Sequence, residues 1–532
     1  MVTRINVPKV AKRATRKVAA VAAPMARQAG NTARKAASSA AHNVSHAVSG
    51  SLGLGGHRMS KVDTAWLRMD SESNLMMIVG VWVLKPGVSR AALCQRIDER
   101  LLKYPRFRQR VEQDATGATW VVDEHFAMDR HVVLEKLARK PKGQEQAALQ
   151  DRVAELAVQP LDKSRPLWQF HLVENYLGGS AIIVRIHHCI ADGIALIAVT
   201  HSLVDGGSAP PQRPEHPVHR SGLEGAEDWL ADTLLKPITD LTVKALDAAG
   251  DGAVKSMEMM IDPQRGIEKG LHSSVDLAKL AFHVLGDAAA LVLMPDDSST
   301  RLKGVPGHRK RVAWCAPIPL EEVKAVGKAL NCSINDVLMS CVAGAIGEYL
   351  KSFGDPITGK EIRAMVPVNL RPIEQAYKLG NRFGLAPMVL PIGVENPVER
   401  VYEVRRRMRA LKGSMQPLMA FGLLAVAGLL TKPAQDAMLS LFSRKTTAVM
   451  TNVPGPREKL TFCGSTIEQS IAWVPQSGTV GLGISILSYG GGVQFGVMTD
   501  STLCPEPQKI INEFEPEFAK LSMVTLMLPW GE

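Results

Sequence analysis

The amino-acid sequence predicts an α/β protein with two folded regions. Strand-like and helix-like runs alternate from Met59 to about Asp205, and the same alternation returns from about Thr300 to Glu532. A polar, proline-rich interval and a long, mostly helical run lie between the two regions. A chain of 532 residues also exceeds one ordinary domain of about 150 residues. We therefore expect domains at 58–205 and 300–532, a helical crossover linker at 206–299, and a separate tail at 1–57.

The first region combines buried-type strands with amphipathic helices. The strand-like runs are 76–84, 120–126 and 181–188. Apolar residues recur at helical spacing in 90–104 and 145–158. This alternation of element types favours an α/β layer architecture over a purely helical or purely β one.

The last region begins with a strand-like run at 311–320. Helices are expected at 321–330 and 333–350, and a strand at 361–369. Two runs of alternating apolar and polar residues within 483–500 are separated by three consecutive glycines, 490–492. Glycine accepts the positive φ angles of a tight hairpin turn, whereas a phosphate-binding loop would need a helix to follow. A β-hairpin is therefore the predicted structure.

The net charge of +11 lies almost entirely in the tail. Residues 1–58 contain ten lysines and arginines and no acidic residue, out of 63 basic and 52 acidic residues in the chain. The rest of the chain is nearly neutral, so we expect no nucleic-acid partner. A glycine-rich segment at 49–56 predicts a flexible joint. The tail fits a solvated arm, an arm on an anionic lipid surface, or an organellar targeting segment.

Seven cysteines are spread at wide, uneven intervals with no CxxC pair. This pattern indicates reduced thiols in a cytoplasmic protein and gives no zinc-ligand spacing. We expect neither a metal nor a cofactor.

The longest apolar runs, 417–430 and 281–294, fall short of the ~20 residues that cross a bilayer. The run at 417–430 is expected to form a core or interfacial helix.

One segment carries the strongest chemical signal. An apolar strand ends in His187 and His188, and Asp192 and Gly193 follow in an HHxxxDG pattern. A neutral imidazole accepts a proton from an alcohol near neutral pH. The carboxylate of Asp192 is suited to holding the turn or orienting a histidine, and glycine permits backbone geometry that a Cβ would forbid.

Two other interpretations of this segment stay open. The histidines could be ordinary partly buried residues, with Asp192 capping the next helix. Adjacent strand side chains point to opposite faces, so only one histidine would face a given cavity. For the same reason Cys189 is not expected to act as a nucleophile beside His188.

The HHxxxDG pattern resembles that of acyl-CoA-dependent acyltransferases related in fold to chloramphenicol acetyltransferase. Further segments accompany it in a fixed order: Pro166-Leu167-Trp168, Lys310-Arg311-Val312-Ala313-Trp314, Asn335-Asp336, Val366-Pro367-Val368-Asn369-Leu370-Arg371, Gly380-Asn381-Arg382-Phe383-Gly384 and Asn452-Val453-Pro454-Gly455-Pro456. In this order the chain resembles the bifunctional wax ester synthase/diacylglycerol acyltransferase family over about residues 58–530.

The resemblance implies two chloramphenicol acetyltransferase-like domains with mixed sheets and flanking helices, and an active site in a tunnel between them. It implies transfer of a long acyl group from acyl-CoA to a fatty alcohol or diacylglycerol, at the surface of a membrane or lipid inclusion. By this analogy His188 is the general base, and His187 and Asp192 support it. Pro166, Leu167 and Trp168 shape the first domain, and Asn335 and Asp336 reach the tunnel from the second.

Several roles stay open. Asn335 could donate a hydrogen bond to the oxyanion or serve as an N-cap. Arg371 could pair with Asp192 or lie on the surface, and Asn452 is expected in a rigid turn. The chain departs from the family at 75–77, where Leu-Met-Met stands in place of the common Pro-Met-His, which puts a histidine role there in doubt.

Two alternative functions follow from the same residues. One is a condensation-type enzyme that uses a carrier-protein thioester. The other is a non-catalytic coat of lipid inclusions. The preference between fatty alcohol and diacylglycerol, and the oligomeric state, are not set by the sequence.

Overall fold

The computed structural model describes residues 57–114, 117–210, 296–370, 379–412, 420, 424 and 432–527. The tail at 1–56, most of the expected linker, the run at 281–294 and Arg371 lie outside these residues, as does the run at 417–430 except for Ala420 and Leu424. Those two residues are helical and buried. The described residues belong to one unit in the division of the chain.

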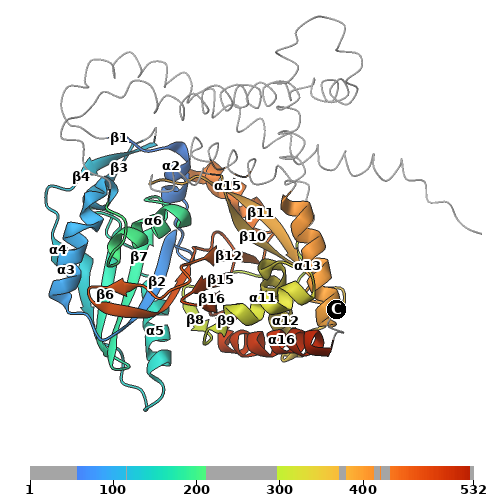
Figure 1. Ribbon diagram of the computed structural model, residues 1–532. Helices are drawn as coiled ribbons and strands as arrows, with labels where there is room; N and C mark the ends of the chain where they lie inside the picture. The colour runs from blue at the N-terminus through green and yellow to red at the C-terminus, as the bar shows by residue number, and fades with distance from the viewer. Residues whose placement is uncertain are drawn as a thin grey trace, which may run out of the picture. The chain divides into compact units, whose positions relative to one another are not determined.

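A six-stranded sheet organises the N-terminal part, shown in blue to green in Figure 1. Its strands run in the order β13-β14-β2-β7-β6-β5. The central pair, β2 (Met77–Lys85) and β7 (Gly179–His187), is antiparallel and mostly buried. The next strands are β6 (Trp168–Tyr176) and β5 (Val132–Glu135). The predicted strands at 76–84 and 181–188 are confirmed.

Helices and a small sheet surround this layer. The helices are α2 (Lys61–Arg68), α3 (Arg90–Glu99), α4 (Met128–His131), α5 (Glu145–Ala157) and α6 (Gly193–Leu203), with 3₁₀ turns η1 (Leu101–Lys103) and η2 (Pro105–Arg108). The small sheet contains β1 (His57–Arg58), β3 (Gln109–Asp114) and β4 (Gly117–Val122). The helices predicted at 90–104 and 145–158 are confirmed as α3 with η1 and as α5.

The C-terminal part, yellow to red in Figure 1, contains a second sheet. Its strands are β8 (Lys310–Trp314), β9 (Ile318–Pro319), β10 (Ile362–Asn369), β11 (Phe383–Leu390), β12 (Ala448–Pro454), β15 (Leu482–Tyr489) and β16 (Gly492–Asp500). Strand β12 is parallel to both β10 and β15, while the other pairs are antiparallel. The mixed sheet expected from the family resemblance is therefore present.

The helices of this part are α11 (Leu320–Ala329), α12 (Ile334–Lys351), α13 (Pro397–Lys412), α15 (Lys432–Ser443) and α16 (Pro507–Met527). The hairpin predicted around the three glycines is confirmed, since β15 pairs with β16 up to Tyr489 and Gly492. Gly490 and Gly491 have φ angles of 59° and 82°. Two consecutive positive φ angles are typical of a type I′ hairpin turn.

One hairpin from the C-terminal part joins the N-terminal sheet. Strands β13 (Thr461–Phe462) and β14 (Ser465–Trp473) are antiparallel to one another, and β14 pairs along β2 from Lys85 to Val79. The sequence prediction had placed these residues in the second domain. The crossing strand also packs on the second sheet, where a Cβ at Gly496 would overlap the side chain of Ile471.

Apolar packing holds the crossing strand on both sides. Trp473 of β14 lies 5.8 Å from Trp314 of β8 between ring centroids, and both are buried. They share one apolar cluster with Val81 of β2 and Leu149 of α5. The two sheets thus share a continuous core along β14.

Within the described residues no single helix has the length and apolar composition to cross a membrane. Only α11 and α12 taken together pass that test, and a 99° bend separates them.

All seven cysteines are free thiols. The same residues contain no group of three or more potential metal ligands.

Candidate active site

The two histidines lie at the end of β7, held in place by the neighbouring strands. The amide of His187 donates to the carbonyl of Leu167 at 2.9 Å, and the amide of His188 donates to the carbonyl of Met76 at 2.7 Å. Both side chains are buried. Their rings have separate partners, Asp70 for His187 and Asn381 for His188, as the alternation of strand side chains predicts.

His188 is enclosed by aromatic rings. Trp66 of α2 stacks on it at 4.3 Å with an interplanar angle of 16°, and Phe383 of β11 lies at 5.4 Å. Burial lowers the pKa of His188 from 6.5 to about 4, although the nearby charge of Asp192 acts in the opposite direction. The neutral form of the imidazole is therefore favoured near pH 7, which is the form that a general base requires.

The hydrogen bond of His188 fixes which nitrogen carries the proton. Its Nδ1 lies 2.8 Å from Oδ1 of Asn381. An amide oxygen only accepts, so Nδ1 is the protonated nitrogen. The lone pair on Nε2 is then left for a substrate proton.

His187 has a structural environment instead. Its Nδ1 accepts the amide N–H of Cys189 at 3.1 Å, and its Nε2 faces Asp70 at 3.3 Å. Burial lowers the pKa of His187, but Cys189 and the Asp70 carboxylate raise it by more, to about 10. The Cys189 contact nevertheless requires an unprotonated Nδ1, so we assign the neutral tautomer on this geometry, with Nε2 donating to Asp70. The buried Cys189 contributes its backbone to this arrangement.

Asp192 is the N-cap of α6. One carboxylate oxygen accepts the amide of Ala195 at 2.9 Å, and the other accepts the amide of Arg382 at 2.9 Å. The backbone of Asp192 also donates to Gly380 at 3.3 Å. The capping interpretation is thus correct, and the same carboxylate holds a segment of the C-terminal part next to His188.

The structure corrects the reason proposed for Gly193. This glycine is the first residue of α6 and is absent from the residues with positive φ. A Cβ at this position would meet no heavy atom within 4 Å. Gly193 therefore leaves space in the cavity wall and does not serve a strained turn.

Pro166, Leu167 and Trp168 form part of the first core, as expected. Trp168 is fully buried, donates from Nε1 to the carbonyl of Phe107 at 2.9 Å, and stacks on His131 at 4.3 Å. Leu167 supplies the carbonyl that fixes His187. The segment positions the histidines through the backbone of β6.

Asn335 and Asp336 lie at the beginning of α12. Ser333 is the N-cap, and Asp336 completes a capping box by accepting the Ser333 amide at 2.8 Å. The alternative that Asn335 is the N-cap is therefore wrong. Its Oδ1 accepts a hydrogen bond from Nδ2 of Asn452 at 3.0 Å. Asn452 lies in β12, so the predicted turn is also wrong. Asn452 lines the cavity, whereas Asn335 and Asp336, which were expected to reach it, are absent from its lining.

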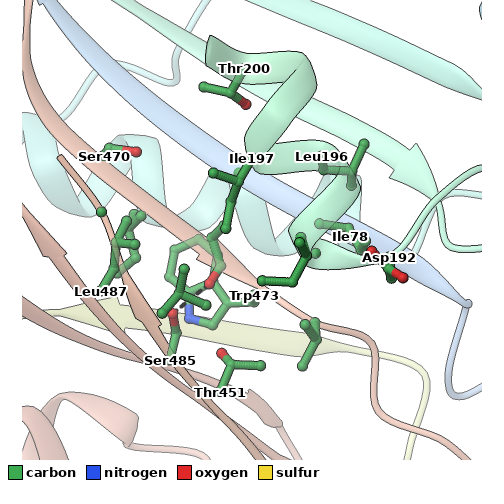
Figure 2. Close-up of a pocket in the computed structure, with 18 of the residues that line it drawn as sticks. Ile78, Asp192, Leu196, Ile197, Thr200, Thr451, Ser470, Trp473, Ser485 and Leu487 are labelled. Carbon is green, nitrogen blue, oxygen red and sulfur yellow. Dashed lines mark hydrogen bonds between the residues drawn. The ribbon is translucent and has the colours of Figure 1, made fainter. Parts of the chain in front are cut away.

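A cavity of about 430 Å³ extends from His188 between the two sheets. Its walls come from β2, β7 and α6 of the N-terminal part and from β12, β14 and β15 of the C-terminal part (Figure 2). Leu196 and Ile197 of α6 lie on one side, and Trp473 and Leu487 on another. Most of the lining is apolar, so the space suits a long hydrocarbon chain.

Sequence reasoning assigned no role to three residues around the base: Asp63, Trp66 and Asn381. Asn381 lies in the Gly380–Gly384 segment that was noted only for its resemblance, and the other two lie on α2. Asp63 gives no clear local signal, because an acidic residue is ordinary in the first turn of a helix of mixed composition. Their convergence on His188 depends on contacts between distant parts of the chain.

Comparison with known proteins agrees with this geometry. The model of the wax ester synthase/diacylglycerol acyltransferase catalytic domain matches residues 59–338, and the WS/DGAT C-terminal domain model matches residues 379–522. A Mycobacterium tuberculosis protein named "Probable diacyglycerol O-acyltransferase tgs1" is 26% identical over 480 residues, which cover 88% of this chain and 96% of that protein.

Solved structures share the fold. The wax ester synthase/diacylglycerol acyltransferase from Marinobacter aquaeolei VT8 matches with a TM-score of 0.59 and 19% identity, covering 88% of this chain and 99% of that chain. Polyketide synthase associated protein 5 from Mycobacterium tuberculosis matches with a TM-score of 0.51 and 16% identity, over 88% and 99% of the two chains. With a neutral buried histidine at an apolar cavity and both family models matched, this chain belongs to the wax ester synthase/diacylglycerol acyltransferase family and is an acyltransferase.

Proposed function

We propose that the chain moves a long acyl group from coenzyme A to a fatty alcohol or diacylglycerol, with Nε2 of His188 as the general base. The observation that carries this assignment is the environment of the ring. Its burial lowers the pKa, which favours the neutral form, and its Nδ1 lies 2.8 Å from Oδ1 of Asn381, which leaves the lone pair on Nε2. His188 also lines the cavity, whereas His187 is absent from its lining.

The reaction needs no covalent acyl-enzyme, because a thioester is already activated. The substrate hydroxyl oxygen attacks the thioester carbon while Nε2 takes its proton. The tetrahedral intermediate then collapses, the carbon–sulfur bond breaks, and the proton passes from Nε2 to the leaving thiolate. The products are an ester and free coenzyme A. Asp192, His187 and Leu167 hold the backbone around the base through the contacts described above.

The first prediction concerns His188 itself. Replacing it with alanine removes the proton acceptor, so we expect turnover to fall roughly 10²- to 10⁴-fold. The measurement is transfer of a labelled acyl group from its CoA thioester to hexadecanol and, in parallel, to dioleoylglycerol. The ratio of the two wild-type products ranks the acceptors. Wild-type protein that makes neither product would favour the coat or carrier-protein alternatives.

The second prediction concerns pH. Because burial depresses the pKa of His188 to about 4, the base form predominates above that pH and is lost as the pH falls through it. We expect kcat/KM to stay level down to about pH 5, with an acid limb near 4. Circular dichroism at each pH separates this limb from unfolding. A limb near 6.5, in protein that stays folded, would contradict the assigned environment.

We assign the oxyanion contact to the paired amides of Asn452 and Asn335. Asn452 lines the cavity, and one of its two N–H bonds is directed to Asn335, which leaves the other for the substrate oxygen. This is the third prediction: alanine at either position lowers kcat, with the larger loss at Asn452, of about 10²-fold. A larger loss at Asn335 would indicate that Asn335, and not Asn452, contacts the substrate oxygen directly. Near-normal turnover of both variants would reject the assignment.

Water-insoluble acceptors require access from a lipid surface, and the basic tail is suited to such a surface. Nine positive charges without a negative one in residues 1–57 attract an anionic bilayer by about 1 kcal/mol per basic residue. As the fourth prediction, removal of residues 1–57 weakens co-sedimentation with anionic vesicles and leaves the weaker sedimentation with neutral vesicles unchanged. Equal sedimentation of both forms with anionic vesicles would exclude the tail as the anchor.

A further inference from the structure

Asn381 connects the base to the opposite part of the fold. It is 5% exposed and lies just before β11, in the C-terminal part. Its side-chain oxygen accepts from Nδ1 of His188 at 2.8 Å. Its side-chain nitrogen donates to the carbonyl of His188 at 2.7 Å and to Oδ1 of Asp63 at 2.7 Å. One amide thus contacts both the ring and the backbone of the base.

The orientation of this amide is set by its partners. Both groups near its nitrogen, the Asp63 carboxylate and the His188 carbonyl, are acceptors. The reversed amide would place its oxygen against these two acceptors and its N–H against Nδ1. Such an arrangement would lose two buried hydrogen bonds and require the ring proton to move to Nε2. The observed orientation and the Nδ1 proton therefore depend on each other.

Asp63 is itself held in place. Its side chain is 1% exposed, and its Oδ1 accepts the backbone amide of Asn381 at 3.0 Å in addition to the side chain. Its Oδ2 pairs with the guanidinium of Arg106 at 3.1 Å. Arg106 also donates to the carbonyl of Ile190 at 2.7 Å and lies over the ring of Trp120. A buried charge with these partners is expensive to displace.

A second carboxylate holds the same segment. Asp192 accepts the amide of Arg382, and its own amide donates to Gly380, so the residues on both sides of Asn381 are fixed. Gly380 has a φ of 112°, and a Cβ there would lie 3.3 Å from the guanidinium of Arg106. The backbone that presents Asn381 is therefore tied to the N-terminal part by two carboxylates, Asp63 and Asp192.

We propose that Asn381 is a positioning residue, oriented by Asp63, that holds His188 in the tautomer with the proton on Nδ1 and so keeps Nε2 as the proton acceptor. On this account the aspartate of the HHxxxDG motif acts on the base indirectly, by fixing the segment that carries Asn381. The kinetic tests of this assignment rest on the proposed function. The NMR test does not, because the tautomer is measured in the protein without substrate.

The test of the tautomer uses nitrogen-15 NMR of the imidazole in the whole protein, labelled at histidine. We expect the wild type to show a protonated Nδ1 and an unprotonated Nε2 for His188, identified by its disappearance in His188→Ala. Asn381→Ala should move part or all of the proton to Nε2. A wild-type ring protonated at Nε2, or an Asn381→Ala spectrum unchanged at His188, would overturn the proposal even if the enzyme is active.

A buried asparagine with a different role supplies the matched control. Asn74 is 2% exposed and donates to the carbonyls of Gly478 and Val480, with no bond to His188. Asn74→Ala should lower the thermal midpoint and leave the His188 tautomer as in the wild type. If both alanine variants changed the tautomer equally, general loosening and not the Asn381 contact would be responsible.

A reciprocal exchange tests the link to Asp63 and is the fifth prediction. Asn381→Asp alone places two carboxylates together and should lower kcat roughly 10- to 100-fold, a loss typical of an oriented supporting partner. The double variant Asn381→Asp/Asp63→Asn removes the repulsion between the two carboxylates and keeps an acceptor at Nδ1 of His188. It should recover part of the lost kcat, with the KM for acyl-CoA within threefold of the wild type, because the new carboxylate faces the His188 carbonyl where the amide had donated.

The double variant also carries a pH signature. A carboxylate next to Nδ1–H stabilises the imidazolium, so the pKa of His188 rises and the acid limb of kcat/KM moves up by at least one pH unit. Partial recovery of kcat with this shift supports the proposal. An unmoved acid limb in a double variant that folds would overturn it. Absence of transfer by the wild type would reject the proposed function and leave the NMR result to decide the tautomer.

Discussion

The pairing of β14 with β2 is the contact on which the active site depends. This strand belongs by sequence to the C-terminal part but completes the N-terminal sheet. Trp473 at its end packs against Trp314 of the second sheet, so the two layers have a fixed spacing. The cavity and the loop that carries Asn381 both need that spacing, because each is built from residues of both parts.

Local pattern was sufficient for most elements and for the position of His188 at the end of a strand. Alternation and helical spacing predicted β2, β7, α5 and α12, and the glycines predicted the hairpin turn, because these depend on neighbours along the chain. The HHxxxDG segment singled out His188, which lines the cavity. The position of β14 was missed because an alternating strand has the same sequence pattern in either sheet.

The environment of the base was beyond sequence reasoning for a related cause. Asn381 and His188 are separated by 193 positions, and Asp63 and Asn381 by 318. No periodicity links such positions, and asparagine is ordinary in loops. The reason expected for Gly193 was wrong, since space in a cavity cannot be distinguished from a required φ angle in the sequence. Asn335 was placed correctly at the start of α12, whereas its bond to Asn452 depends on the tertiary fold.

The apolar lining of the cavity also affects which nucleophile reacts. A neutral histidine activates water as readily as it activates an alcohol, and water is present at far higher concentration. The aromatic rings of Trp66 and Phe383 cover the imidazole, and the space beyond it is bounded mainly by aliphatic and aromatic side chains. Water gains few hydrogen bonds in such a space, whereas an alkyl chain fills it. The chemistry of the walls therefore favours ester synthesis over wasteful thioester hydrolysis.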